Sequence, residues 1–490
     1  MNLATLLEMA AMSMPDSVLV SSGDDHLTGD ELVERAGKAA GALRAAGAVK
    51  LAYLGVSDVS MPVALLGSAW AGVPFMPLNY REPMDSLVTL LQKHPGTFVV
   101  AEAETARGLA AAGIQSATPD TWWRDGEAPE RWEDDPDQIA VLLHTSGTTS
   151  APKAVVLRHR HLTSYIMNAT ELLASIGETV LVTVPPYHVA GVANLLTNLY
   201  AGRRLVYLPS FTAREWLDIA ASEGVTRAMV VPTMLARIVD ELDAADELAP
   251  TSLESISYGG AKMPRPVLER ALQRFPAVGF VNAYGLTETS STIAVLGPDD
   301  HAGARAGDPI ALRRLDSVGQ VVSDIEVQVV DDDGRPLPTG EVGEIRVRGA
   351  QVSGEYLGDE SPLDPDGWFA TRDLGWVDDD GYLFVQGRRD DTIIRGGENI
   401  VPDEIEEAIE RHPLVTEVCV IGVPDEEWGE SIVAVVVTKE PVDADELRKF
   451  AKDQLRSAKT PDRILFRDEL PHTPLGKLQR GIVRRELAPD

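Results

Sequence analysis

The spacing of apolar and polar residues in the first part of the chain predicts strands that alternate with helices. Apolar runs at 51–56, 73–77 and 97–101 have the length of buried strands. Alanine- and leucine-rich stretches at 28–47, 61–71 and 85–93 separate them and are typical of helices. The first of these helices opens with capping-box spacing, Thr28 followed by Glu31. Such alternation favours a mainly parallel sheet covered by helices.

The same alternation resumes after residue 150 and changes character near Ser317. Strands are expected at 179–184, 203–208, 227–231, 253–257 and 277–283, with helices at 213–222 and 265–274. Beyond Ser317, short alternating runs at 325–330 and 344–347 and a tight turn at 378–381 predict antiparallel strands. The fold class is therefore α/β, with a large N-terminal domain of mainly parallel sheets and helices and a β-rich subdomain.

A polar stretch at 387–391 marks the expected domain boundary. After it come a helix at 402–411, strands at 415–421 and 432–438, and a helix at 443–455, which form a small α+β pattern. We expect an N-terminal domain at 1–388, a hinge at 389–390, and a mobile C-terminal domain at 391–490.

Charge and cysteine content narrow the classes of partner. Lys and Arg total 44 and Asp and Glu total 76, so the net charge is −32. Such a chain repels nucleic acid and anionic membranes, so no nucleic acid partner is expected. The single cysteine, Cys419, lies in an apolar run and is expected to fill a core. No apolar run reaches transmembrane length, and the first 15 residues lack the basic residues of a secretory signal, so we expect a cytoplasmic protein.

The most informative stretch is a hydroxyl-rich loop between two apolar runs, at 141–157. The loop contains Thr145, Ser146, Gly147, Thr148 and Thr149 and ends at Lys153. Backbone N–H groups, hydroxyls and one ammonium can converge on the phosphates of a nucleotide in such a loop. The P-loop pattern of NTPases is absent, and a polar surface turn would explain the same residues without any ligand.

Three further segments place chemically active side chains in the chain. Thr287 and Glu288 follow an apolar strand, where parallel sheets bind ligands, and Glu288 could hold Mg²⁺. Asp373 could accept the hydroxyls of a ribose, and Lys477 lies in an irregular segment near the C-terminus. Taken alone, Glu288 and Lys477 are better explained as a solvated glutamate and a surface lysine, and Asp373 as well explained as a turn-capping aspartate.

The four segments and their neighbours occur in an order that resembles the adenylate-forming superfamily. This superfamily includes acyl-CoA synthetases, firefly luciferase and the adenylation domains of peptide synthetases. The resemblance runs from about Leu27 to Arg480. Its motifs are TSGTTSAPKAV, PPYHVAG, YGGAKMP, NAYGLTE, TRDLG, GRRDDTIIRGGENIVPDEIE and PLGK. It implies a two-step reaction in which a carboxylate attacks the α-phosphate of ATP and a thiol then displaces AMP.

The resemblance also implies a role for individual residues. Those for ATP and AMP are Thr145, Ser146, Gly147, Thr148, Thr149, Lys153, Gly260, Ala261, Asn282, Ala283, Tyr284, Gly285, Thr287, Asp373 and Arg388. Those for catalysis are Lys477, Glu288, Thr287 and His188, with Glu288 as the metal ligand. Those for the acyl group are His188, Val189, Gly259, Ser290 and Ser291. Those for coenzyme A are Gly396, Gly397 and Glu398, and Asp390 is the hinge.

The phosphate loop departs from the family pattern at two positions. Ser150 and Ala154 stand where the family usually has glycine. A side chain at 150 hinders a turn with positive φ.

We therefore expect an ATP-dependent acid–CoA ligase that uses ATP, Mg²⁺ and coenzyme A on a fatty or aryl acid, with a slight preference for fatty acyl. An amino-acid-activating enzyme would place an aspartate within 187–190 to pair with the α-ammonium, and that segment reads Tyr-His-Val-Ala. An enzyme that loads a carboxylic acid onto a carrier protein would carry the same motifs, as would a degenerate nucleotide-binding protein. The degenerate protein is disfavoured by the presence of Lys153, Glu288, Asp373 and Lys477 together.

Overall fold

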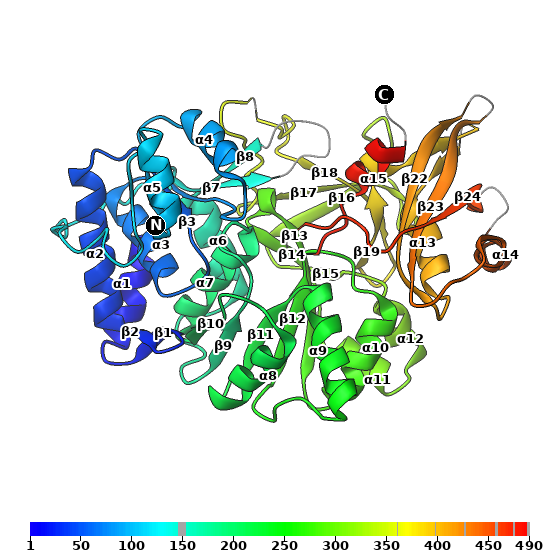
Figure 1. The fold of residues 1–490 in the computed structure, drawn as a ribbon, viewed down its shortest axis with the longest axis horizontal. Helices are drawn as coiled ribbons and strands as arrows, with labels where there is room; N and C mark the ends of the chain where they lie inside the picture. The colour runs from blue at the N-terminus through cyan, green and yellow to red at the C-terminus, as the bar shows by residue number, and fades with distance from the viewer. Residues whose placement is uncertain are drawn as a thin grey trace.

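Three sheets make up the protein, with thirteen, six and five strands (Figure 1). The computed structural model describes residues 1–145, 153–359, 361–396, 398–425, 428–455, 459–473 and 476–487, without the side chains at 7 and 399. The confirmed fold class is α/β, with large mixed sheets and a small C-terminal domain.

The six-stranded sheet has the order β6-β5-β3-β4-β7-β8. Its strands are β3 (Lys50–Leu54), β4 (Phe75–Pro77), β5 (Thr97–Ala101), β6 (Ser116–Ala117), β7 (Ile139–Thr145) and β8 (Lys153–Arg158). All pairs are parallel except the antiparallel β7–β8 pair, whose two strands flank the predicted phosphate loop in the sequence. The helices of this part of the chain are α2 (Gly29–Ala45), α3 (Ser60–Ala71), α4 (Met84–Gln92) and α5 (Ala103–Ala111).

The thirteen-stranded sheet has the order β16-β17-β18-β19-β15-β14-β13-β12-β11-β9-β10-β1-β2. Its strands are β1 (Val18–Ser22), β2 (Asp25–Thr28), β9 (Thr179–Val182), β10 (Arg204–Tyr207), β11 (Arg227–Val230), β12 (Ser255–Gly259), β13 (Gly279–Leu286), β14 (Ser291–Leu296), β15 (Gly319–Val321), β16 (Ile325–Val330), β17 (Gly343–Gly349), β18 (Phe369–Val377) and β19 (Tyr382–Arg388). Strands β1, β10, β9, β11, β12 and β13 are parallel, and the part from β14 to β16 is antiparallel. Two 3₁₀ turns follow its strands, η1 (Thr287–Thr289) and η2 (Arg389–Asp391).

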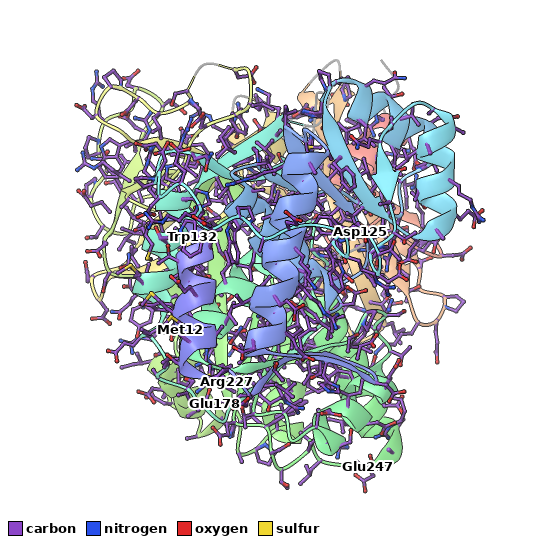
Figure 2. All side chains as sticks on the ribbon, turned by 90° about the vertical axis from the view of Figure 1, so that its left-hand side faces the viewer. Met12, Asp125, Trp132, Glu178, Arg227 and Glu247 are labelled. Carbon is purple, nitrogen blue, oxygen red and sulfur yellow. The ribbon has the colours of Figure 1, made fainter. Side chains whose placement is uncertain are left out.

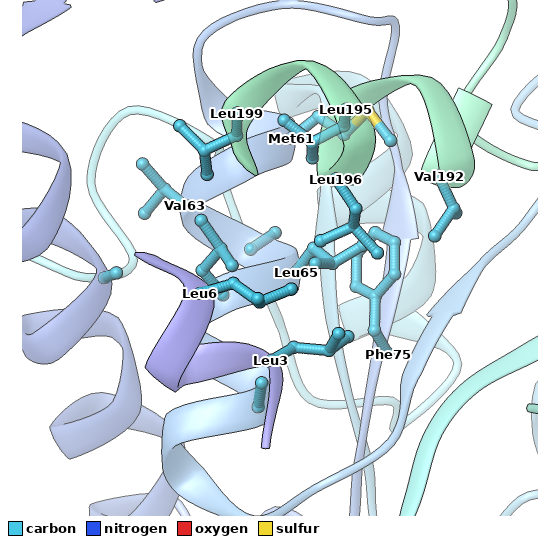
Figure 3. Close-up of a cluster of buried hydrophobic side chains, with 14 of the residues drawn as sticks. Leu3, Leu6, Met61, Val63, Leu65, Phe75, Val192, Leu195, Leu196 and Leu199 are labelled. Atoms are coloured by element: carbon cyan, nitrogen blue, oxygen red, sulfur yellow. The ribbon is translucent and has the colours of Figure 1, made fainter. Parts of the chain in front are cut away.

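Eight further helices of the described chain belong to the large N-terminal part that contains these two sheets. They are α1 (Leu3–Ser13), α6 (His159–Ala169), α7 (Val189–Ala201), α8 (Ala213–Ser222), α9 (Pro232–Ala245), α10 (Arg265–Arg274), α11 (Pro298–Arg305) and α12 (Pro309–Arg314). Helix α7 packs its leucines against α1 and α3 in the largest core (Figure 3). A second core lies on the opposite side of β11, β12 and β13, under α8, α9 and α10.

The small sheet has the order β21-β20-β23-β22, and β24 pairs with β23. Its strands are β20 (Ile393–Arg395), β21 (Glu398–Ile400), β22 (Val415–Asp425), β23 (Gly429–Thr438) and β24 (Arg463–Phe466). Its helices are α13 (Pro402–Glu410), α14 (Ala444–Gln454) and α15 (Arg480–Leu487). Cys419 is fully buried here, and burial raises the pKa of its thiol to about 12, which confirms a core role.

The structure corrects two local expectations. Strand β13 continues to Leu286, so Tyr284 and Gly285 lie within a strand, because β14 returns beside them and pairs with them. Asp373 lies inside β18, opposite Arg388 of β19, and not in a turn. Among the described residues, no helix is long and apolar enough to cross a membrane.

Candidate active site

Glu288 is placed by the end of β13 and held by a segment that the sequence analysis did not single out. The Tyr356 hydroxyl donates to Glu288 Oε1 at 2.8 Å, and the Ser353 N–H donates to the Glu288 carbonyl at 2.8 Å. Burial first, and the Glu288 carboxylate second, raise the pKa of Tyr356, so its hydroxyl stays protonated. The carboxylate is therefore oriented by a neutral donor.

The same segment holds the base of the phosphate loop. Val155 of β8 forms a bridge with Tyr356, and Lys153 Nζ lies 5.1 Å from the centre of the Tyr356 ring. Lys153 also forms an ion pair with Asp359 at 2.9 Å, with both side chains about half exposed. Lys153 therefore lies beside the Tyr356–Glu288 pair. Thr145 is the partner of Lys153 in the hairpin, and Ser146, Gly147, Thr148, Thr149 and Ser150 lie outside the described residues.

Asp373, Arg388 and Tyr284 form a second cluster: Asp373 and Arg388 are opposite each other on the adjacent strands β18 and β19, and Tyr284 reaches them from β13. The Tyr284 hydroxyl donates to Asp373 Oδ2 at 2.5 Å, and Arg388 Nε lies 3.2 Å from Asp373 Oδ1. Burial raises the pKa of Asp373, whereas Arg388 and the Tyr284 hydrogen bond oppose that rise. Each carboxylate oxygen keeps further acceptor capacity, so a ribose can still bind to it.

The predicted adenine segment lies beside this cluster, at the carboxyl ends of β12 and β13. Asn282 and Ala283 pair with Tyr258 and Gly259, and Asn282 Nδ2 lies 3.5 Å from the Ser317 carbonyl. Gly259 has no room for a side chain, since a Cβ there would lie 2.3 Å from the Ala283 carbonyl. By contrast, Gly260 has a φ of +82° and open space beside it, and Ala261 is half-buried.

Lys477 reaches this region from the small domain. Its N–H donates to Thr473 Oγ1 at 3.1 Å, and Gly476 packs so closely on Thr233 of α9 that a Cβ would lie 2.4 Å from the hydroxyl. Burial lowers the pKa of the Lys477 ammonium, and the Arg388 guanidinium adds to this lowering. The carboxylates that oppose the shift belong to Asp373, Asp391 and Glu288. The structure thus brings Lys477 close to Glu288 and to the Asp373–Arg388 pair of the large domain.

A cavity of about 280 Å³ lies between the two domains beside this segment. Its lining includes Thr233 and Arg237 of α9 together with His472 and Gly476 of the small domain. Lys477 is surrounded by many protein atoms, which lowers its pKa, but its side chain is still open to solvent. A substrate can therefore approach the region between the domains.

The predicted acyl residues are not equally available to a substrate. His188 caps the start of α7, and its Nε2 is buried without a hydrogen-bond partner among the described residues. Burial lowers the pKa of this imidazole to about 4, so it is neutral at pH 7. Val189 and Ser291 are half-buried, but Ser290 is buried and its hydroxyl donates to the Gln351 carbonyl at 2.8 Å. The Ser290 hydroxyl is thus committed within the protein.

The predicted hinge position lies next to the Asp373–Arg388 cluster, and the predicted coenzyme A positions follow it in the small domain. Asp390 forms an ion pair with Arg372 at 3.3 Å, and Arg372 has a positive φ of 64°. The Gly396 N–H donates to the Trp428 carbonyl at 2.7 Å within the small domain, and Glu398 is exposed. Gly397 lies outside the described residues.

Sequence reasoning missed Ser353, Tyr356 and Asp359. The signal available was weak, a single aromatic residue within a polar, glycine-containing stretch. Their partners, Glu288 and Lys153, lie 68 and 206 residues away in the chain.

A phosphate-loop lysine, a strand-end glutamate, a buried aspartate–arginine pair and a lysine from a second domain define an enzyme of the adenylate-forming class. Comparison with known proteins identifies the family. The family model "AMP-binding enzyme" matches residues 7–357, and "AMP-binding enzyme C-terminal domain" matches residues 404–477. The chain belongs to the AMP-binding enzyme family, in its acid–CoA ligase branch.

Two curated relatives span nearly the whole chain. A fatty acid–[acyl-carrier-protein] ligase, ScoC of Streptomyces coeruleorubidus, is 34% identical over 94% of this chain and 91% of its own. The indoleacetate–CoA ligase of Aromatoleum aromaticum is 32% identical over 100% of this chain and 98% of its own.

A solved relative exists in two forms. ATP-bound MatB from Rhodopseudomonas palustris has a TM-score of 0.88 at 27% identity, covering 100% of this chain and 99% of that one. The apo form of MatB covers the same shares of the two chains at the same identity, with a TM-score of 0.76. The chain as a whole is therefore more similar in structure to the ATP-bound form than to the apo form.

Proposed function

We propose that this enzyme joins a carboxylic acid to coenzyme A at the expense of ATP. A carboxylate oxygen attacks the α-phosphorus of ATP, the bond to the bridging oxygen breaks, and pyrophosphate leaves. The thiol of coenzyme A then attacks the acyl carbon, AMP leaves with its oxygen, and the thiol proton passes to solvent. The observation that carries this proposal is the approach of Lys477 from the small domain to Arg388, Asp373 and Glu288.

ATP binds across the two clusters of the large domain. Asp373 accepts hydrogen bonds from the ribose hydroxyls, and Arg388 donates to the ribose. The carboxyl ends of β12 and β13 hold the adenine. Lys153 and the hydroxyls of the loop from Thr145 to Thr149 hold the outer phosphates, and Thr287 the α-phosphate. For this to happen, Lys153 exchanges the exposed carboxylate of Asp359 for a phosphate, which costs little because exposed ion pairs contribute about 0–1 kcal/mol.

Glu288 fits the role of the Mg²⁺ ligand. One of its oxygens accepts from Tyr356, and further acceptor capacity remains for a cation or its water. A carboxylate together with substrate phosphates and water is a usual set of ligands for Mg²⁺. When bound, Mg²⁺ offsets negative charge on the phosphates.

Lys477 carries the first step because two anions must meet there. Its ammonium donates to the α-phosphate oxygens as charge develops on them in the transition state. The neutral His188 at the start of α7 borders the acyl group without adding a charge that would compete for the carboxylate. For the second step the small domain turns about Asp390 and exchanges Lys477 for the loop of Gly396 and Gly397.

The acceptor is the point on which the relatives differ, because one is named as a carrier-protein ligase and another as a CoA ligase. Coenzyme A is preferred here, with a carrier-protein thiol as the second candidate. A cytoplasmic location and the absence of a nucleic acid partner remain predictions from the sequence.

The test supplies ATP and Mg²⁺ with a panel of fatty, benzoic, cinnamic and amino acids. Pyrophosphate release identifies the acid, and thioester formation is then compared between coenzyme A and a phosphopantetheinylated carrier protein. If none of the acids in the panel leads to pyrophosphate release, ligase activity is contradicted. Thioester formed only on the carrier protein would contradict the choice of acceptor.

A further inference from the structure

Helix α7 has two faces of different character. Val192, Leu195, Leu196 and Leu199 point into the core shared with α1 and α3 (Figure 3). Asn194 and Thr197 lie on the opposite face, and both are only half-buried although their neighbours along the helix are buried. The Thr197 hydroxyl is already used, since it donates to the Ala193 carbonyl at 2.7 Å. Asn194 is therefore the side chain of interest.

Asn194 faces the large sheet on the side away from its second core. Its Nδ2 lies 3.9 Å from the sulfur of Met229 on β11. Met229, Ser257 and Val281 are neighbours in register across β11, β12 and β13, and all three are half-buried. The residues that precede them, Ala228, Ile256 and Phe280, are buried in the second core. Solvent therefore reaches this stretch of sheet under α7.

The same strands connect this stretch with the predicted active site. Gly259 and Ala283 lie two residues beyond Ser257 and Val281, at the ends that border the adenylate. Two strand residues span about 7 Å, which is the scale of one substituted aromatic ring. A substrate whose carboxylate is activated beside Gly259 can thus extend its far end toward Asn194.

A chain of hydrogen bonds fixes which way the Asn194 amide points. Arg203 Nη1 donates to Asn198 Oδ1 at 3.0 Å, and Asn198 Nδ2 donates to Asn194 Oδ1 at 3.1 Å. Arginine can only donate, so Asn198 must turn its oxygen to Arg203 and its NH₂ to Asn194. Asn194 must then accept, which leaves its own NH₂ directed at Met229.

The chain is anchored at the surface by a strong ion pair. Arg203 Nε donates to Glu178 at 2.7 Å, and Glu178 also binds Arg227, which lies beside it in Figure 2. The hydrogen bond from Arg227 is the largest cause that lowers the pKa of Glu178 to about 2, so the anchor stays charged. The orientation of Asn198, and through it that of Asn194, is thus held at any ordinary pH.

We propose that Asn194 sets the specificity of the acyl site by donating a hydrogen bond to an oxygen on the distal part of the acid. This inference rests on the proposed acid–CoA ligase activity and deepens it. The Met229 thioether is a weak acceptor, and it is the side-chain acceptor that the described residues offer to this NH₂ group, so a substrate that displaces solvent from this region can provide a stronger one. A site of this kind favours an aromatic acid with a hydroxyl, ether or carbonyl oxygen over an acid that ends in hydrocarbon, because the latter leaves the donor unpaired.

The experiment compares matched pairs of acids that differ only in the distal oxygen, such as 4-methoxycinnamic and 4-ethylcinnamic acid. The kcat/KM for pyrophosphate release should be higher for the oxygen-bearing acid by about 10-fold or more. Asn194→Leu should bring the ratio close to one. Thr197→Val, on the same face, should leave the ratio unchanged because that hydroxyl bonds within the helix.

A second variant tests the orientation without removing Asn194. Asn198→Asp can only accept, so it loses the hydrogen bond that Asn198 Nδ2 donates to the Asn194 backbone carbonyl at 2.7 Å, and the Asn194 side chain must turn its NH₂ toward position 198 and present its amide oxygen to the substrate. The preference should then shift to acids with a distal donor, such as 4-aminocinnamic acid. An active enzyme whose ratios do not change in Asn194→Leu or Asn198→Asp would overturn this inference alone. If no acid leads to pyrophosphate release, in the wild type or in any variant, the proposed function is overturned and this inference with it.

Discussion

At the scale of single residues, the active site depends on charges supplied by separate parts of the chain. Lys153 comes from β8, Glu288 from the turn after β13, and Lys477 from the segment after β24. Tyr356 orients Glu288 through a hydrogen bond, and Asp359 forms an ion pair with Lys153. Removal of one such group should affect one step of the reaction without affecting the fold.

Lys477→Ala should reduce acyl-adenylate formation by roughly 10²–10³-fold, because it removes a donor to the transition-state phosphate. The variant should still convert supplied acyl-adenylate to thioester, since the small domain has then turned. The two half-reactions are measured separately, with the exposed Lys452→Ala as the control of equal charge change. Equal slowing of both halves would contradict the division of labour between the two domain positions.

Lys153→Ala and Glu288→Ala should each lower the rate of adenylation by about 10²-fold while the thermal melting curve stays unchanged. The exposed ion pair of Lys153 contributes little stability, so Asp359→Asn should likewise leave the melting curve unchanged. Pyrophosphate release and melting temperature are measured for all three. Near-normal adenylation in Lys153→Ala or Glu288→Ala would rule out the assigned phosphate and Mg²⁺ roles.

At the scale of elements, β13 is the strand on which the site depends. It carries Tyr284 to Asp373 and leads directly into Glu288, and it is paired on both sides, by β12 and β14. A register irregularity with β14 falls between Tyr284 and Gly285. Close packing at this point leaves no space for a side chain at 285.

Gly285→Ala should destabilise the protein by about 1–3 kcal/mol, because its Cβ would lie 1.9 Å from the Ser291 carbonyl and meet backbone that cannot turn away. Urea unfolding measures the change. The control is Gly297→Ser before α11, where φ is −78° and nothing lies within 4 Å of the added Cβ. If the two variants are equally stable, the backbone contact at 285 is not a constraint.

At the scale of the whole molecule, the contact between the domains includes a cluster of carboxylates on α13. Glu407 forms an ion pair with Lys262 of the large domain. Burial first, and the neighbouring Glu406 second, raise the pKa of Glu410 to about 7 and that of Asp403 to about 6. A carboxylate whose pKa is raised on folding binds its proton more tightly in the folded protein.

The stability that Glu410 contributes is therefore present below its unfolded pKa of about 4.5 and is lost as the pH rises through about 7. Glu410→Gln should have the melting temperature of the wild type near pH 4.5 and a higher one at pH 8, because no charge then develops. Melting curves at several pH values measure this, with the exposed Glu440→Gln as the control. If the melting temperatures of Glu410→Gln and the wild type differ by the same amount at every pH, the ionisation of Glu410 does not affect stability.

Local features of this chain could be predicted from the sequence because neighbouring residues create them. The capping box of Thr28 and Glu31 starts α2 as expected, and the two apolar runs around the phosphate loop form the β7–β8 hairpin. Alternating strands and helices sufficed for the fold class, and the order of the motifs sufficed for the family. These signals are contained in short stretches of chain, where periodicity and capping act directly.

Only the tertiary structure decided which partners these residues meet. The pairs of Glu288 with Tyr356, Lys153 with Asp359 and Lys262 with Glu407 join residues far apart in the sequence. The direction of the Asn194 amide follows from Arg203 through Asn198, and no local pattern contains that information. Such contacts depend on how strands and helices pack across the two domains, so the sequence determined the chemistry of individual residues while the packing determined their orientation and specificity.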